Sequence, residues 1–162
     1  MIKQLNPSDF PTAAKVIRAS FATVAADLGL TEQNCPKYVA FATTAEWLQN
    51  QYGWGWFMYG LYDDNQLIGY VSISKSTEAE SAYEIHNLAV LPGYRHKGFG
   101  KQLLEFCKAK VKEMGGDKIT LGMVEENTVL KNWYAENGFT HTGTKKFDHF
   151  PFTCGYMEWI ME

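Results

Sequence analysis

Cysteine and histidine are both scarce in this chain, which has three cysteines and four histidines in 162 residues. Cys35, Cys107 and Cys154 are odd in number and far apart, with no CxxC spacing. They exclude a disulfide framework and favour reduced thiols in a cytoplasmic protein. His141, His149 and Cys154 lack the short spacings of zinc ligands. We therefore predict no metal site.

The chain also lacks an excess of positive charge and a long apolar run. Fifteen Lys and Arg stand against eighteen Asp and Glu, a net charge of -3, so no basic field attracts nucleic acid. No apolar run approaches the roughly 20 residues that span a bilayer, and "MIKQLNPSDF" has no apolar core like that of a signal peptide. We expect one domain, residues 1–162, with neither nucleic acid nor a membrane as partner.

Two hydrophobic periods are present. Helical spacing predicts four helical regions, the second of them split by an irregular join near Thr43 and Thr44: residues 6–29, 31–55, 100–116 and 127–138. Period-two patterns predict seven strands: residues 2–5, 56–62, 67–76, 81–91, 118–124, 139–147 and 154–162. The cluster "DDNQ" predicts a hairpin between the second and third strands. The strand, helix, strand order of the second half requires a crossover with at least one parallel pair. The predicted fold class is therefore α/β, a twisted mixed sheet of about seven strands flanked by about four helices.

The stretch "RHKGFGK", residues 95–101, follows a strand end, where ligands of such sheets usually lie. Its glycines let consecutive N–H groups face one point, and the following helix adds a positive N-terminal dipole, so we predict a phosphate site. A P-loop would need lysine where Phe99 stands, and a dinucleotide fingerprint would need glycine where Leu103 stands. The residues predicted to hold the phosphates are Arg95, His96, Lys97, Gly98, Phe99, Gly100 and Lys101.

One further pattern does fit this turn. Arg95, Gly98 and Gly100 match [Q/R]xxGx[G/A], which resembles the pyrophosphate-binding segment of the GNAT family of N-acetyltransferases. Upstream, "YEIHNLAVLPGYR" is similar to the family's fourth strand, and downstream "ENTVLKNWYAENGF" is similar to its NxxAxxxYxxxGF helix. The positions of that helix motif that match are Asn127, Tyr134, Gly138 and Phe139, whereas Leu130 or Lys131 stands where alanine is usual.

The resemblance implies a single-domain fold whose sheet splays at its middle into a V-shaped cleft for acetyl-coenzyme A as co-substrate. It implies coenzyme contacts at Leu88, Ala89, Val90, Asn127 and Tyr134. It also implies that the Val90 N–H group stabilises the oxyanion and that Tyr134 is the general acid for the departing thiolate. The implied activity is direct transfer of an acetyl group to a primary amine, of a small molecule or a peptide, in a ternary complex.

Acetyl transfer also requires a group that takes a proton, because a lysine-like amine has a pKa near 10.4 and is almost wholly protonated at pH 7. Glu84 precedes Val90 by six residues, the spacing at which histone-type members of the family carry their base. Regular alternation along the strand predicts that Glu84, His86, Leu88 and Val90 share one face. We therefore predict that Glu84 or His86, directly or through a water molecule, accepts the proton in the acceptor groove.

The acceptor itself stays open at the level of sequence. The aromatic strand Trp54–Tyr59 is expected in the core rather than in the acceptor pocket. Residues 147–157 either border the acceptor, through His149, Phe150 and Phe152, or are packed as a loop. The rival functions are a non-catalytic acetyl-coenzyme A sensor and a nucleotide-binding protein, and a homodimer is possible.

Overall fold

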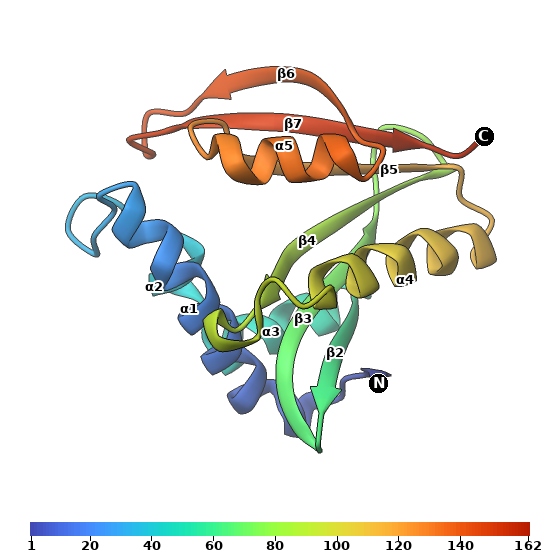
Figure 1. Ribbon diagram of the computed structural model, residues 1–162, viewed down its shortest axis with the longest axis horizontal. Coiled ribbons are helices and arrows are strands. Elements are labelled where there is room, and N and C mark those ends of the chain that lie inside the picture. The colour runs from blue at the N-terminus through green and yellow to red at the C-terminus, as the bar shows by residue number, and fades with distance from the viewer.

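The computed structural model describes residues 1–162, and its seven strands form one sheet in the order β1-β2-β3-β4-β5-β7-β6 (Figure 1). The strands are β1 (Ile2–Gln4), β2 (Phe57–Asp63), β3 (Gln66–Lys75), β4 (Ala82–Val90), β5 (Lys118–Val124), β6 (Thr140–Lys146) and β7 (Thr153–Ile160). All neighbouring strands are antiparallel except β4 and β5, which supply the predicted parallel pair. The α/β class, the strand number and the strand order along the chain are confirmed.

The chain has five α-helices: α1 (Phe10–Asp27), α2 (Val39–Ala42), α3 (Ala45–Gly53), α4 (Phe99–Glu113) and α5 (Thr128–Glu136). The count exceeds four because the second helical region is broken between α2 and α3, where Thr44 caps α3 by accepting a hydrogen bond from Trp47 N. None of the helices combines the length and the apolar character needed to cross a membrane.

The hairpin between β2 and β3 turns at Asp64 and Asn65, whose φ angles are 47° and 63°. Two consecutive residues with positive φ match the right-handed twist of the flanking strands, and Asp and Asn tolerate that conformation. The predicted hairpin is confirmed. It places β3 at the centre of the first half of the sheet, between β2 and β4.

Each face of the sheet is covered by different helices (Figure 1). On one face, which we call the α4 face, the α4 side chains Leu103, Leu104, Cys107 and Val111 are fully buried, and Tyr134 of α5 joins the same cluster. On the opposite face, the α1 face, Phe10 and Ile17 of α1 and Leu48 of α3 pack with Met58 and Tyr70. The apolar side chains that give residues 100–116 their helical period are therefore the ones that hold α4 on the sheet.

The sheet splits at its middle. β4 and β5 pair only at Ala82 with Lys118, Tyr83 with Ile119 and Glu84 with Thr120, and the two strands diverge beyond these residues (Figure 1). The V-shaped splay that the resemblance implied is present. It separates the β1 to β4 half of the sheet from the β5, β7 and β6 half.

A bulge in β4 corrects the prediction that four of its residues share one face. Across β3, Ser72 pairs with His86 but Tyr70 pairs with Ala89, so β4 has one extra residue here, and Asn87 has a φ of 53°. The extra residue shifts the alternation by one position. Asn is one of the few residues that adopt this left-handed conformation readily.

The consequence is a change of face along β4. Glu84 and His86 lie on the α1 face, where Trp56 of the segment before β2 stacks on His86. Leu88 and Val90 pack instead with the α4-face core, and Ala89 packs with the α1-face core. The prediction of a single shared face for Glu84, His86, Leu88 and Val90 is therefore wrong.

Candidate active site

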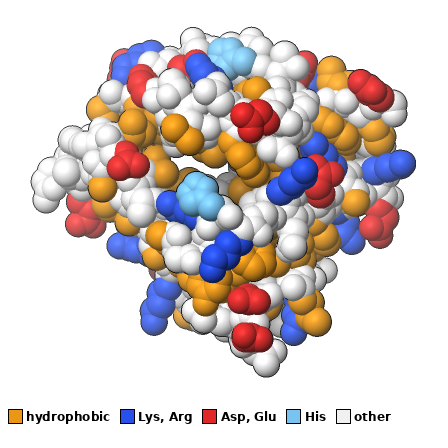
Figure 2. Space-filling model, in the orientation of Figure 1, with side chains coloured by type: hydrophobic (Ala, Val, Ile, Leu, Met, Phe, Trp, Pro, Cys, Tyr) orange, Lys and Arg blue, Asp and Glu red, His pale blue; other side chains and the backbone are white.

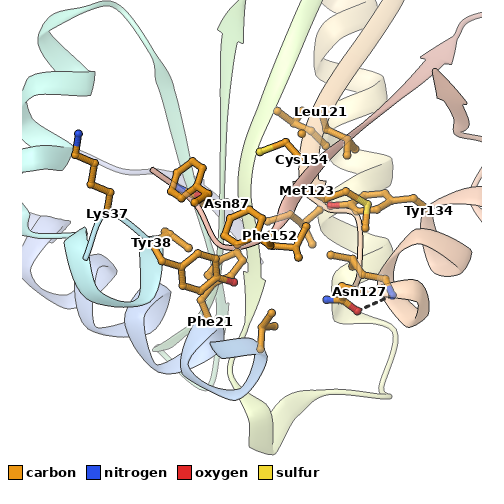
Figure 3. Close-up of a pocket in the computed structure, with 18 residues that line it drawn as sticks. Phe21, Lys37, Tyr38, Asn87, Leu121, Met123, Asn127, Tyr134, Phe152 and Cys154 are labelled. Atoms are coloured by element: carbon orange, nitrogen blue, oxygen red, sulfur yellow. Dashed lines mark hydrogen bonds between the residues drawn. The ribbon is translucent and has the colours of Figure 1, made fainter. Parts of the chain in front are cut away.

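A mainly apolar cavity of about 290 Å³ lies in the splay. β4 contributes Asn87 and Leu88, β5 contributes Met123, and α5 contributes Tyr134 with Asn127 at its start (Figure 3). α1, the segment before α2, and the loop between β6 and β7 supply the remaining wall. Figure 2 shows the molecule hollowed between its two halves. The divergence of β4 and β5 thus opens a passage through the sheet.

The basic turn forms the start of α4. Gly98 has a φ of 83° and His96 a φ of 63°, and no side chain caps the helix. The first N–H groups of α4 donate to no protein acceptor, and His96, Lys97 and Gly98 are exposed. Free N–H groups at a helix N-terminus attract anions, and the surrounding basic side chains add to that attraction. The geometry of the turn therefore suits the phosphate site predicted from sequence.

Arg95 has a different environment from the other basic residues of the turn. Its Nε donates to Val90 O at 3.1 Å, and its two terminal nitrogens donate to Thr23 Oγ1 at 2.8 Å and Ser20 O at 2.6 Å. The guanidinium group thereby ties the turn to α1 and to the end of β4. Direct contact of Arg95 with a phosphate stays a prediction, while its structural role follows from these three hydrogen bonds.

Asn127, which the resemblance assigns to the coenzyme, also stands at the start of α5. Its Oδ1 accepts a hydrogen bond from Leu130 N at 3.2 Å, so it is the N-cap of α5. It also lines the cavity, and its amide nitrogen points away from the helix it caps (Figure 3). The side chain can cap α5 and still offer N–H donors to a ligand.

Tyr134 is 6% exposed and packs between Trp133 and Phe139, at ring centroid distances of 5.0 Å and 5.4 Å. Its hydroxyl group points toward the cavity (Figure 3). Burial, with a smaller contribution from the nearby Cys107, raises the pKa of Tyr134. The phenol is therefore protonated at neutral pH and available as a proton or hydrogen-bond donor.

Val90 lies where its backbone N–H group faces the splay. Leu91 N donates to Ile68 O at 2.8 Å, and Val90 is paired with Gly69, so Val90 is a non-hydrogen-bonded position of the antiparallel ladder. At such a position both backbone groups point away from the partner strand. The Val90 carbonyl accordingly accepts its hydrogen bond from Arg95 rather than from β3.

Glu84 and His86 lie beside each other but do not line the cavity. His86 Nδ1 is 3.9 Å from Glu84 Oε1, and His86 Nε2 is 2.8 Å from Ser74 Oγ. Burial lowers the pKa of His86 to about 4, so the ring is neutral at pH 7. Burial and then the charge of Glu78 raise the pKa of Glu84. The structure therefore separates the two predicted bases from Tyr134 and Asn127.

The wall opposite α5 was only partly foreseen. Phe150 and Phe152 line the cavity, as one reading of the β6–β7 loop predicted, whereas His149 does not. Tyr38, with Phe21 of α1, was missed, because it lies in the irregular segment before α2 where no period marks a buried side chain. Of the aromatic strand, Met58 and Tyr59 are core residues as expected, but Trp54 is 58% exposed.

Comparison with known proteins agrees with this geometry. Residues 28–139 match the model of the acetyltransferase (GNAT) family. An uncharacterised N-acetyltransferase of Lactobacillus delbrueckii subsp. lactis is 28% identical over 149 residues, covering 86% of this chain and 83% of the relative. A ribosomal protein bS18 alanine N-acetyltransferase of Haemophilus influenzae is 31% identical, covering 68% and 73%. The crystal structure of the PaiA N-acetyltransferase of Thermoplasma acidophilum, in complex with coenzyme A, has a TM-score of 0.83 with 24% identity, covering 99% and 98%.

The family match and the relatives support an acetyl-CoA-dependent N-acetyltransferase. The chain belongs to the acetyltransferase (GNAT) family, as the basic turn and the downstream helix motif predicted.

Proposed function

We propose that this enzyme transfers the acetyl group of acetyl-CoA directly to a primary amine held in the splay cavity. The observation that carries the proposal is the position of the cavity, which lies beside the diverging end of β4 and has the buried, protonated Tyr134 in its wall. The start of α4 supplies anion-binding N–H groups for the diphosphate of the coenzyme. The amide of Asn127 is suited to the pantetheine arm.

The proposed reaction forms a bond between the amine nitrogen and the acetyl carbon and then breaks the bond between that carbon and sulfur. Negative charge develops on the carbonyl oxygen, and the N–H groups of Val90 and Leu88 are its proposed donors, because backbone dipoles neither titrate nor need to reorganise. Tyr134 then donates its proton to the departing thiolate.

The proton released by the amine goes to Glu84 in this proposal, through water, since Glu84 does not line the cavity. Its raised pKa favours the role, because a base is most effective when its pKa lies near the working pH. His86 is neutral and already contacts Ser74, so it is better suited to position Glu84 than to take the proton. The cytoplasmic location and the homodimer remain predictions from the sequence.

The test measures release of the free thiol from acetyl-CoA in the presence of a panel of primary amines. Tyr134→Phe should lower kcat by about 100-fold or more, the usual contribution of a general acid, with the KM for acetyl-CoA unchanged. Glu84→Gln should lower kcat less and should remove the rise of activity with pH through the pKa of Glu84, because only the carboxylate form accepts a proton. Stabilisation by acetyl-CoA without turnover of any amine would instead favour a non-catalytic sensor.

A further inference from the structure

Tyr38 is a buried polar side chain that the catalytic proposal does not use. It is 7% exposed, and its ring contacts Phe21 of α1, Phe41 of α2 and Phe152 of the β6–β7 loop at centroid distances of 6.3 Å, 6.2 Å and 6.0 Å. These contacts join the two halves of the molecule over the splay. They also fix the direction of the ring, so the position of the hydroxyl group is set by packing.

The hydroxyl group of Tyr38 has no hydrogen-bond partner in the protein and points into the cavity from the side opposite Tyr134 (Figure 3). Burial is the main cause that raises the pKa of Tyr38, so the phenol is neutral and cannot act as a base at pH 7. The hydroxyl group is not among the buried polar atoms that lack a partner, so it opens into the cavity, where an acceptor can replace water as its hydrogen-bond partner. Tyr38 and Tyr134 are the two tyrosines that line this cavity.

The wall around Tyr38 indicates which ligand chemistry fits. Its neighbours in the cavity are Phe21, Val24, Phe150 and Phe152, and none of the lining residues is Asp or Glu. The single charged lining residue is Lys37, whose ammonium group points away from the cavity (Figure 3). If the acceptor carried a positive charge in addition to its reacting amine, that charge would lose its hydration in this cavity without meeting an opposite charge.

We propose that Tyr38 binds the acceptor, its hydroxyl oxygen accepting a hydrogen bond from the incoming amine, and that the enclosing aromatic side chains select a primary amine carried on an apolar group, an aromatic ring above all. The inference rests on the proposed function, because it assigns the acceptor to the same cavity. The volume of about 290 Å³ is shared with the acetyl end of the coenzyme, so a flat, compact group fits better than a long polar chain.

The experiment compares kcat/KM for phenethylamine, spermidine and a peptide that begins with alanine, in the wild type, Tyr38→Phe and Tyr59→Phe. Tyr59 is the matched control, since it is 5% exposed and buried against Phe106, outside the cavity. Phenethylamine should be preferred at least tenfold. Tyr38→Phe should raise the KM for the amine by about three- to tenfold, the effect of one lost hydrogen bond, and should leave the KM for acetyl-CoA unchanged.

Thermal unfolding separates binding from a structural role. Because the Tyr38 hydroxyl has no protein partner, Tyr38→Phe should leave the Tm unchanged or raise it slightly. A preference for spermidine or for the peptide, an equal loss in Tyr59→Phe, or an effect of Tyr38→Phe on acetyl-CoA alone would overturn the inference while leaving the proposed function intact. Absence of turnover with every amine would overturn both.

Discussion

The two sides of the splay cavity are built in different ways. The turn side consists of the turn at residues 95–101, the start of α4, and Asn127 and Tyr134 of the α5 segment. Its proposed ligand contacts are largely backbone N–H groups and side chains close together in the sequence. The clasp side consists of the segment around Tyr38 and the β6–β7 loop with Phe150 and Phe152, two segments that are far apart in the sequence.

Because the two sides are built differently, we expect them to control different properties, coenzyme affinity and the choice of acceptor. A backbone conformation that presents N–H groups suits a diphosphate, which is the same in every reaction of the family. An aromatic clasp depends on the size and shape of its side chains, which can change without disturbing the backbone. The turn side is therefore expected to set coenzyme affinity, and the clasp side to set the choice of acceptor.

The largest effect that would sharpen this contrast is expected at Gly98. An added methyl group meets nothing within 4 Å at either Gly98 or Gly93, but only Gly98 has a positive φ, of 83°. The left-handed conformation costs an L-residue about 1–2 kcal/mol. Because no neighbouring atom would hold an alanine side chain at position 98 in this conformation, Gly98→Ala should change the local backbone of the turn and raise the KM for acetyl-CoA by about tenfold.

Gly93→Ala provides the matched control and should leave that KM at its wild-type value. Equal KM values in the two variants would show that the shape of the turn does not govern coenzyme binding. If Gly98→Ala raised the KM for the acceptor but not the KM for acetyl-CoA, the turn would bind the acceptor, and its assignment to the coenzyme would be wrong.

A smaller effect is expected at Arg95, the residue that connects the turn to α1. Lysine cannot reproduce three hydrogen bonds from one planar group, so Arg95→Lys should cost about 1 kcal/mol of stability. For a chain of this length that lowers the Tm by about 2–4 °C in thermal unfolding without ligand. An unchanged Tm with a raised KM for acetyl-CoA would mean that Arg95 contacts phosphate directly and that its hydrogen bonds to α1 do not stabilise the fold.

The smallest change in the KM for acetyl-CoA is expected at Asn127, where two variants separate its role as a helix cap from its role as a coenzyme contact. Asn127→Ala should lower the free energy of unfolding by about 1 kcal/mol through loss of the N-cap, whereas Asn127→Asp keeps the cap and replaces the amide donors by a negatively charged carboxylate. Asn127→Asp should therefore show the wild-type Tm with a modestly raised KM for acetyl-CoA. A wild-type KM in Asn127→Asp would leave Asn127 as a cap and nothing more.

Much of the fold could be predicted because its signals are local. "DDNQ" contains the two residues that tolerate positive φ in the hairpin turn, and the stripe of Leu103, Leu104, Cys107 and Val111 repeats at the helical period. The bulge in β4 was missed, since the strand pattern alone shows no extra residue. Asn87 was the available signal, because asparagine within a strand is one of the few residues that adopt the left-handed conformation.

Local sequence signals were enough to predict the order of the elements, the basic turn at the start of α4 and the placement of Tyr134 and Asn127 on one helix segment. These features depend on dihedral preferences and on spacings within a few turns of the chain. Two other features became visible only in the folded chain: Glu84 and His86 lie outside the cavity, and Tyr38 packs against Phe152 in the cavity wall. The position of Glu84 and His86 depends on strand register, because one inserted residue moves the following side chains to the other face. The contact between Tyr38 and Phe152 depends on packing between segments that are far apart in the sequence, which no local pattern predicts.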